Sequence, residues 1–134
     1  MKEKRYCFKI NSFGQALEVI EFFNKSQIKP VLFFSFHLIN GLKIDWLLEI
    51  KGMLLKQFEF KNFDIYVDVK KNYGLFINLV ENKIDYIKVD ANTNMLKKLN
   101  EIGKINKVLI NPNFSILDLS KSLSILDELK KIKI

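Results

Sequence analysis

The stretch that most constrains the fold of this chain runs over residues 62–91. Two segments rich in isoleucine, valine, tyrosine and phenylalanine, at 63–69 and 86–91, enclose a segment of helical composition. Each apolar segment carries an aspartate near its end, Asp68 in the first and Asp90 in the second. The pattern predicts a strand–helix–strand unit. Its two strands are expected to be parallel, because a parallel connection has to be long enough to hold a helix.

The rest of the sequence follows the same plan. Strands are predicted at 5–10, 31–36, 63–69, 86–91 and 107–110, and residues 113–119 are expected to form a loop or a short extended piece. Helices are predicted at 12–25, where Ser12 and Gln15 match a capping box, and at 41–60, 74–82, 92–103 and 120–132. Gly103 is interpreted as the stop of the fourth helix, and Leu123, Leu126 and Leu129 are expected to face inward from the last.

This alternation of strands and helices predicts an α/β fold. We expect a three-layer α/β/α arrangement with a mostly parallel, five-stranded sheet, flavodoxin-like and with strand order 2-1-3-4-5. The alternative is a SpoIIAA-like or partial-barrel arrangement, since the first strand could pair antiparallel at an edge. The length of 134 residues fits a single α/β domain over 1–134.

The surroundings of the protein are predicted from its apolar and charged residues. The strongest apolar run, at 31–39, has about half of the roughly 20 residues that a membrane span needs, so no membrane association and a cytoplasmic location are expected. The net charge is +7, but Arg5 is the only arginine among the 22 basic residues. Nucleic-acid readers favour arginine and a gathered basic patch, so we interpret the lysines as a solvated coat and expect no nucleic-acid partner.

Cysteine and histidine each occur once, as Cys7 and His37. A single cysteine excludes a disulfide within the chain, and one histidine excludes the common multi-histidine metal sites. Glycine-rich phosphate loops and the serine elbow of hydrolases are absent from the sequence. We therefore predict no catalytic residues, no metal site and no cofactor, and leave open whether the protein is an enzyme.

Polar residues at the predicted strand ends form the candidate ligand site. Parallel sheets bind ligands outside the carboxyl ends of their strands. The residues expected there are Ser35, His37, Asp68, Asp90 and Asn111. Two carboxylates, a hydroxyl and an imidazole could bind a small molecule or a divalent cation, or perform acid–base chemistry. The competing interpretation, which we favour, is that the aspartates cap helices or accept from loop amides.

The predicted helix at 41–60 carries a second apolar row. Trp46, Ile50 and Met53 follow one another at i, i+4 and i+7, away from its main apolar stripe. We interpret the row as an interface, and the leading functional hypothesis is a non-enzymatic protein-interaction module that acts as a homodimer. The alternative is a small-molecule or metal-binding protein with its site at the strand ends. Coverage of Trp46 by loops or by the last helix is the competing structural explanation for the row.

From Asp68 onward the chain also resembles a group of small, uncharacterised alphaproteobacterial α/β proteins. The spacing from Asp68 to Gly74, then Pro112 and the segment Leu117-Asp118-Leu119, carry the resemblance, and Ser35 matches a serine at the end of the second strand. Where that group has Asp-Cys-Gly-Asp, this chain has Asp68-Val69-Lys70-Lys71. The resemblance implies the α/β fold and a bacterial cytoplasmic setting, and it implies no activity.

Overall fold

The structure is a computed structural model that describes residues 5–132. Its strands are β1 (Cys7–Lys9), β2 (Val31–Phe34), β3 (Asp64–Lys70), β4 (Tyr86–Val89), β5 (Leu109–Ile110) and β6 (Ile116–Asp118). Its helices are α1 (Phe13–Asn24), α2 (Phe36–Gln57), α3 (Tyr73–Glu81), α4 (Thr93–Asn106) and α5 (Ile125–Lys130). None of the helices in this described part is long and apolar enough to cross a membrane.

The strands form one sheet in which every pair of neighbours is parallel. Strands β1 to β5 lie side by side in the order in which they occur in the chain. In the register of the sheet, Cys7 pairs with Val31 and Tyr66 pairs with Tyr86. The α/β class and the parallel sheet with its helices are thus as predicted. A sixth strand, β6, occupies part of the segment for which a loop or short extended piece was expected, and it pairs with β1.

The strand order is β5-β4-β3-β2-β1-β6, and the predicted order 2-1-3-4-5 is wrong. β1 lies inside the sheet and pairs in parallel on both sides, so the antiparallel edge pairing considered for it does not occur. From β1 to β5 each new strand is added on the same side of the previous strand, and one helix lies in each connection. Right-handed crossovers that all step in one direction place their helices on one face of a sheet.

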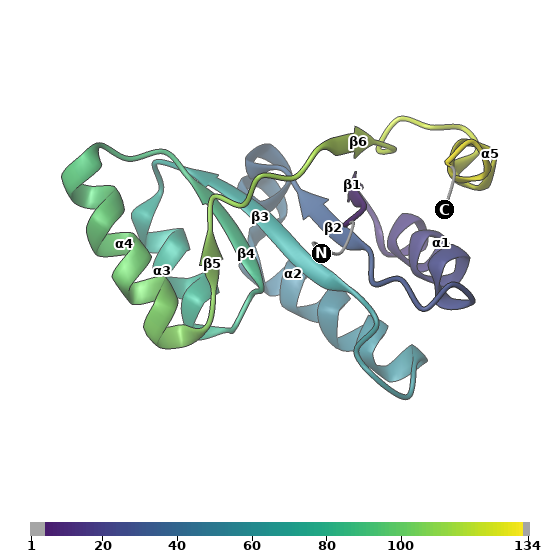
Figure 1. The fold of residues 1–134 in the computed structure, drawn as a ribbon, viewed down its shortest axis with the longest axis horizontal. Helices are drawn as coiled ribbons and strands as arrows, with labels where there is room; N and C mark the ends of the chain where they lie inside the picture. Colours follow the sequence, from purple (N-terminus) through teal and green to yellow (C-terminus); the bar gives the residue numbers. More distant parts are fainter. Residues whose placement is uncertain (1–4, 133–134) are drawn as a thin grey trace.

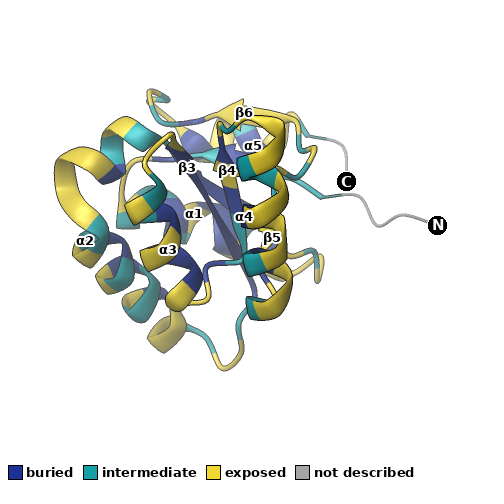
Figure 2. Ribbon diagram, turned by 90° about the vertical axis from the view of Figure 1, so that its left-hand side faces the viewer, coloured by how far each residue is buried: buried dark blue, intermediate teal, exposed yellow. Residues whose placement is uncertain are grey.

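The large hydrophobic core lies between the sheet and the helices that cover this face. Along the strands, Phe8, Leu32 and Ile65 point into this core, while the alternating residues point away from it. All five helices contribute buried side chains to it: Val19 and Phe23 from α1, Leu47 and Leu54 from α2, Phe76 and Leu79 from α3, Leu99 from α4, and Ile125 and Leu129 from α5. Figure 2 shows the central strand β3 buried, and the edge strand β6 and the outer sides of the helices exposed.

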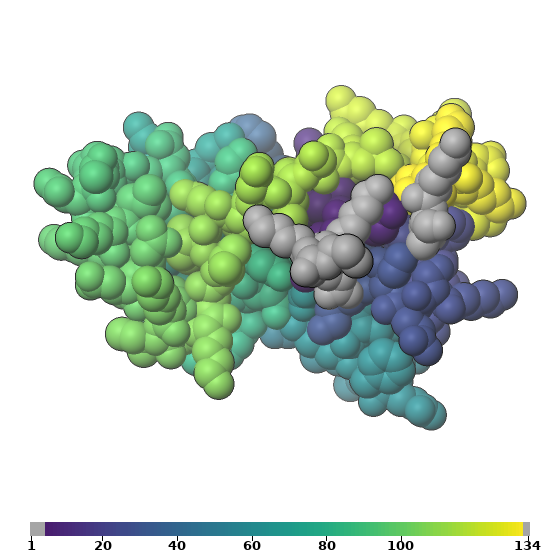
Figure 3. Space-filling model, viewed as in Figure 1, coloured from purple at the N-terminus to yellow at the C-terminus, as the bar shows by residue number. Residues whose placement is uncertain are grey.

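The opposite face of the sheet is covered by residues 111–115, which we call the strap. The strap leaves β5 at one edge and crosses to β6 at the other, as Figures 1 and 3 show. Beneath it lies a smaller apolar cluster of Cys7, Val31, Phe33 and Tyr66, against which Tyr86 and Phe114 pack. The ring of Phe114 meets those of Tyr66 and Tyr86 edge-on at 5.9 and 5.0 Å. A non-helical layer therefore closes this face.

The boundary between β2 and α2 differs from the prediction. The apolar run after Pro30 leaves the sheet at Phe34, and α2 begins at Phe36 because the Ser35 hydroxyl accepts from the backbone N–H of Leu38. Lys43 interrupts the helix with non-helical angles, φ 72° and ψ 162°. Two helical segments, which meet at Lys43, therefore follow β2, where the sequence predicted a longer strand and one later helix.

The last two helices also differ from the prediction. α4 passes through Gly103 and ends at Asn106, where Lys107 adopts the left-handed conformation. Gly103 is needed for a close approach instead, because a Cβ there would lie 2.7 Å from the carbonyl oxygen of Val108. α5 begins only after its Ser124 cap, so Leu129 is buried as expected but Leu123 and Leu126 are exposed.

Candidate functional site

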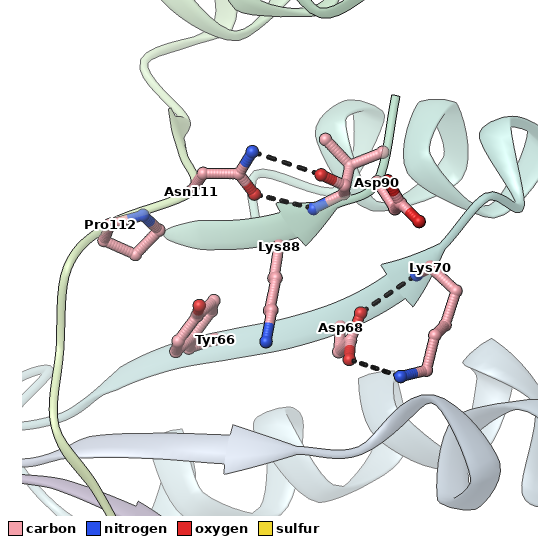
Figure 4. A pocket seen from close by; sticks show the side chains of 8 residues that line it. Tyr66, Asp68, Lys70, Lys88, Asp90, Asn111 and Pro112 are labelled. Atoms are coloured by element: carbon pink, nitrogen blue, oxygen red, sulfur yellow. Dashed lines mark hydrogen bonds and ion pairs between the residues drawn. The ribbon is translucent and has the colours of Figure 1, made fainter. Parts of the chain in front are cut away.

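A pocket of about 350 Å³ lies at the carboxyl ends of β3 and β4, beside the strap. It is lined by Tyr66, Asp68, Lys70, Lys88, Val89, Asp90, Asn111 and Pro112. Three of the residues predicted for a ligand site, Asp68, Asp90 and Asn111, are therefore brought together there (Figure 4). They converge because neighbouring parallel strands end at the same edge of a sheet.

Ser35 and His37 do not line this pocket. The prediction placed both at the carboxyl end of the strand expected at 31–36, but Ser35 caps α2 and His37 lies in the first turn of that helix. The His37 side chain is exposed, and its ring lies 6.1 Å from that of Phe36. The helical start at Phe36 thus separates His37 from the strand ends.

The carboxylate of Asp68 is buried, and each of its two oxygens has a partner. Its Oδ1 accepts from the backbone N–H of Lys70 at 2.9 Å, and its Oδ2 lies 3.5 Å from Lys70 Nζ. Lys70 has a positive φ of 53°, and the pairing of β3 with β4 is irregular at this point. Asp68 therefore shapes the turn that leaves β3, which is the loop-amide role that the sequence favoured for it.

Asn111 is held by the backbone of a neighbouring strand. Its amide nitrogen donates to the carbonyl oxygen of Val89 at 3.1 Å, and its amide oxygen accepts from the N–H of Val89 at 2.8 Å. Asn111 has a φ of 50°, a conformation that asparagine tolerates better than most residues. The side chain continues the hydrogen-bond ladder of β4 while the main chain turns into the strap. Both polar atoms of the side-chain amide therefore have backbone partners.

Two charged side chains of the pocket are left for a ligand. Neither Lys88 nor Asp90 forms a side-chain ion pair within residues 5–132, and both are exposed. Figure 4 shows the Lys88 side chain reaching from β4 towards β3, between Tyr66 and Asp68, with Asp90 just beyond the end of β4. Burial raises the pKa of the Tyr66 phenol to about 12, so the hydroxyl is neutral at physiological pH.

The pocket is not built as a metal site. Among residues 5–132, no three histidine, cysteine, aspartate or glutamate side chains lie close enough together to hold a metal ion. The Asp68 carboxylate is paired with Lys70, and the Asn111 amide is bound to Val89. The groups that can contact a ligand are the exposed ammonium of Lys88 and the exposed carboxylate of Asp90, together with the phenol of Tyr66.

The predicted interface row on α2 is not a continuous exposed surface. Ile50 is buried, with 5% of its surface exposed, and the Trp46 ring packs edge-on against Phe34 at 5.9 Å. Met53 is the exposed member, at 40%. Trp46 is half-buried, and its ring lies against the sheet residue Phe34, whereas the competing explanation expected loops or the last helix to cover it.

A charged network at the opposite ends of the strands was not predicted from the sequence. The buried carboxylate of Asp64 lies 2.6 Å from the Arg5 guanidinium and 3.3 Å from Lys61 Nζ, and Lys61 also pairs with Asp85. Burial lowers the pKa of Arg5, but the hydrogen bond to Asp64 and the field of Tyr86 outweigh it and raise the pKa overall. The sequence feature that could have indicated this network is Asp64, a charged residue within an otherwise apolar strand. Asp64 lies two residues from Tyr66 and therefore on the same face of β3.

Comparison with known proteins assigns no family. No protein-family model matches the chain, and a search of curated proteins finds no match to it. The resemblance to small alphaproteobacterial proteins therefore stays a prediction. The function has to be inferred from the geometry of the site.

Proposed function

We propose that the protein binds a small polar organic molecule in the pocket at the carboxyl ends of β3 and β4. The observation that carries the proposal is the convergence of Asp68 and Asp90 on one pocket together with Lys70 and Lys88. This edge of a parallel sheet is where such folds hold their ligands. Since Asp68 and Lys70 neutralise each other, recognition falls to Asp90 and Lys88.

The free groups define the class of ligand. A carboxylate binds an amine and an ammonium binds an acid, so Asp90 and Lys88 together fit a molecule that carries both. The neutral hydroxyl of Tyr66 can donate one hydrogen bond and accept another. A free amino acid or a compound of similar size and charge has these features. The occupied carboxylate of Asp68 makes a divalent cation a poorer fit.

A thermal-shift screen tests the proposal. The panel is amino acids, nucleotides, sugar phosphates and divalent salts, applied to the wild type, to an Asp90→Asn/Lys88→Met variant and to an Asp127→Asn/Lys130→Met control. The control makes the same charge changes on the short helix α5, away from the pocket. An amino-acid-like compound should stabilise the wild type and the control but not the pocket variant. Absence of any stabilising compound, or equal stabilisation of all three proteins, contradicts the proposal.

Self-association is the second candidate, and exposed apolar residues on and after α2 favour it. Met53, Leu55 and Phe60 are all exposed in this region. A homodimer that covers the Met53 side of α2 would remove that side chain from water, which is the usual driving force of association. The proposed contact therefore centres on Met53 and no longer on Trp46 and Ile50. The two candidates are compatible, because α2 does not line the pocket at the ends of β3 and β4.

A further inference from the structure

A basic pocket lies at the amino-terminal edge of the sheet, opposite the pocket proposed above for a small polar ligand. It has a volume of about 570 Å³ and lies where α2, α3 and α4 meet the chain segments that lead into the strands. Its polar lining consists of Lys51, Lys61, Lys83, Asp85, Asn106 and Lys107. Four cationic side chains thus share one pocket with a single carboxylate.

Only one of the four lysines is neutralised within the pocket. Lys61 pairs with Asp85, and it also contacts Asp64 of β3. Lys51, Lys83 and Lys107 form no side-chain ion pair with any residue in the range 5–132. The pocket therefore carries about three positive charges that no carboxylate of the described chain balances.

Helix ends account for part of this charge but not for all of it. Lys51 Nζ donates at 3.4 Å to the carbonyl of Asn82, which caps the carboxyl end of α3, and Lys107 caps α4. A helix carboxyl terminus carries about half a negative charge. Two such ends offset about one of the three charges, so the excess is still about two.

Two of these lysines, Lys51 and Lys83, also have hydrogen-bond partners within the fold. Lys83 Nζ donates to the side-chain oxygen of Asn106 at 3.0 Å, and the Asn106 amide donates in turn to the carbonyl of Ile102 at 2.9 Å. Burial lowers the pKa of Lys51, and the neighbouring cation of Lys61 lowers it further, while Asp85 opposes the change. An anion that binds nearby stabilises the charged form of a cation that is partly buried next to another cation.

We infer that this basic pocket binds a small, multiply charged oxyanion of the phosphate type through Lys51, Lys83 and Lys107. Lysine recognises phosphate as a compact point charge, and three ammonium groups around one cavity suit an anion with at least two charges. The site is separate from the pocket at the ends of β3 and β4, because the two share no lining residue.

Isothermal titration of the full chain with inorganic pyrophosphate at constant ionic strength tests the inference. The pocket variant is Lys83→Met/Lys107→Met, and the control is Lys97→Met/Lys121→Met, which removes two exposed lysines from outside the pocket. The wild type should bind at a 1:1 ratio, the pocket variant at least tenfold more weakly, and the control within about twofold of the wild type. Equal weakening in both variants means attraction to net charge alone and overturns the inference, as does a lack of saturable binding.

Two further measurements keep the test independent of folding and of the first proposal. In the wild type, saturation with pyrophosphate should raise the pKa of the Lys51 ammonium followed by NMR, and an unchanged pKa contradicts the inference. An Asp90→Asn/Lys88→Met variant should bind pyrophosphate as the wild type does. Loss of binding in that variant places the anion at the other end of the sheet and overturns the assignment to the basic pocket.

Discussion

The side chain of Asn111 pairs with the backbone of Val89 through two hydrogen bonds, so that one residue both extends the ladder of β4 and turns the chain into the strap. The strap then crosses the sheet and brings Phe114 onto Tyr66 and Tyr86. The same turn forms one wall of the pocket that holds Asp90 and Lys88. The contact between Asn111 and Val89 thus lies at the start of the strap and in the wall of the candidate site.

Removal of the Asn111 amide should destabilise the protein markedly. Asn111→Gly keeps the positive φ accessible but loses both hydrogen bonds, and the expected cost is about 2 kcal/mol in the free energy of unfolding. Asn111→Ala should cost about 1 kcal/mol more, because the left-handed conformation is unfavourable for a residue with a Cβ. Urea unfolding measures both. Ser115→Ala, an exposed change in the same strap, serves as the control and should stay within about 0.5 kcal/mol of the wild type.

Two glycines in helices should respond to alanine in opposite ways. A Cβ at Gly103 would lie 2.7 Å from the carbonyl oxygen of Val108 and 2.9 Å from Ile110 Cγ1, so Gly103→Ala should destabilise by about 1–3 kcal/mol. A Cβ at Gly52 in α2 would meet no atom within 4 Å beyond its own stretch of helix, so Gly52→Ala should stabilise by about 0.5–1 kcal/mol. Thermal unfolding compares the two. Equal effects would contradict the close approach of α4 to β5.

Alkaline pH should destabilise the fold through the apolar cluster beneath the strap. Burial raises the pKa of the Cys7 thiol to about 12 from an ordinary 9.0. The folded protein therefore holds a proton that the unfolded chain loses, and this contribution to stability is complete below about pH 9 and is lost towards pH 12. The urea midpoint of the wild type should fall more steeply over this range than that of Cys7→Ala. Parallel curves, or rapid thiol labelling of the folded protein at pH 8, would argue against a buried neutral thiol.

Sedimentation velocity tests self-association through α2. The proposal expects the sedimentation coefficient of the wild type to rise with concentration in the micromolar range, and Met53→Asp to abolish the rise. Trp46→Asp would be a poor test, because it would bury a charge against Phe34 and destabilise the monomer. Glu101→Gln, an exposed change on α4, is the control. A wild type that stays monomeric at every concentration rules out the homodimer.

Some local contacts of this chain follow directly from its sequence, whereas the strand order does not. Ser12 and Gln15 form the predicted cap, with Ser12 Oγ accepting from Gln15 N–H at 3.2 Å and Gln15 Oε1 accepting from the N–H of Asn11 at 2.6 Å. These contacts are local, so residue types at fixed spacing specify them. Strand order depends instead on how distant segments pair, and the position of β6 beside β1 has no local signal in residues 113–119.

The errors within the candidate site have two physical origins, one local and one long-range. Asp68 and Asp90 were found because the ends of parallel strands converge whatever the strand order. His37 was misplaced because the apolar residues around Ser35 suit a buried strand and a buried helix equally well. Asn111 was correctly placed at the pocket, but its pairing with the backbone of Val89 could not be predicted before the register of β4 and β5 was known.

Chemical-shift mapping tests the central claim, ligand binding at the ends of β3 and β4, most directly. Uniformly ¹⁵N-labelled protein is titrated to millimolar concentration with each of the common amino acids, and the amide resonances are followed. The claim predicts that at least one compound shifts amides of residues 66–70, 88–90 and 111, and that Asp90→Asn/Lys88→Met removes these shifts. Spectra that stay unchanged throughout, or shifts confined to other parts of the molecule, would contradict it.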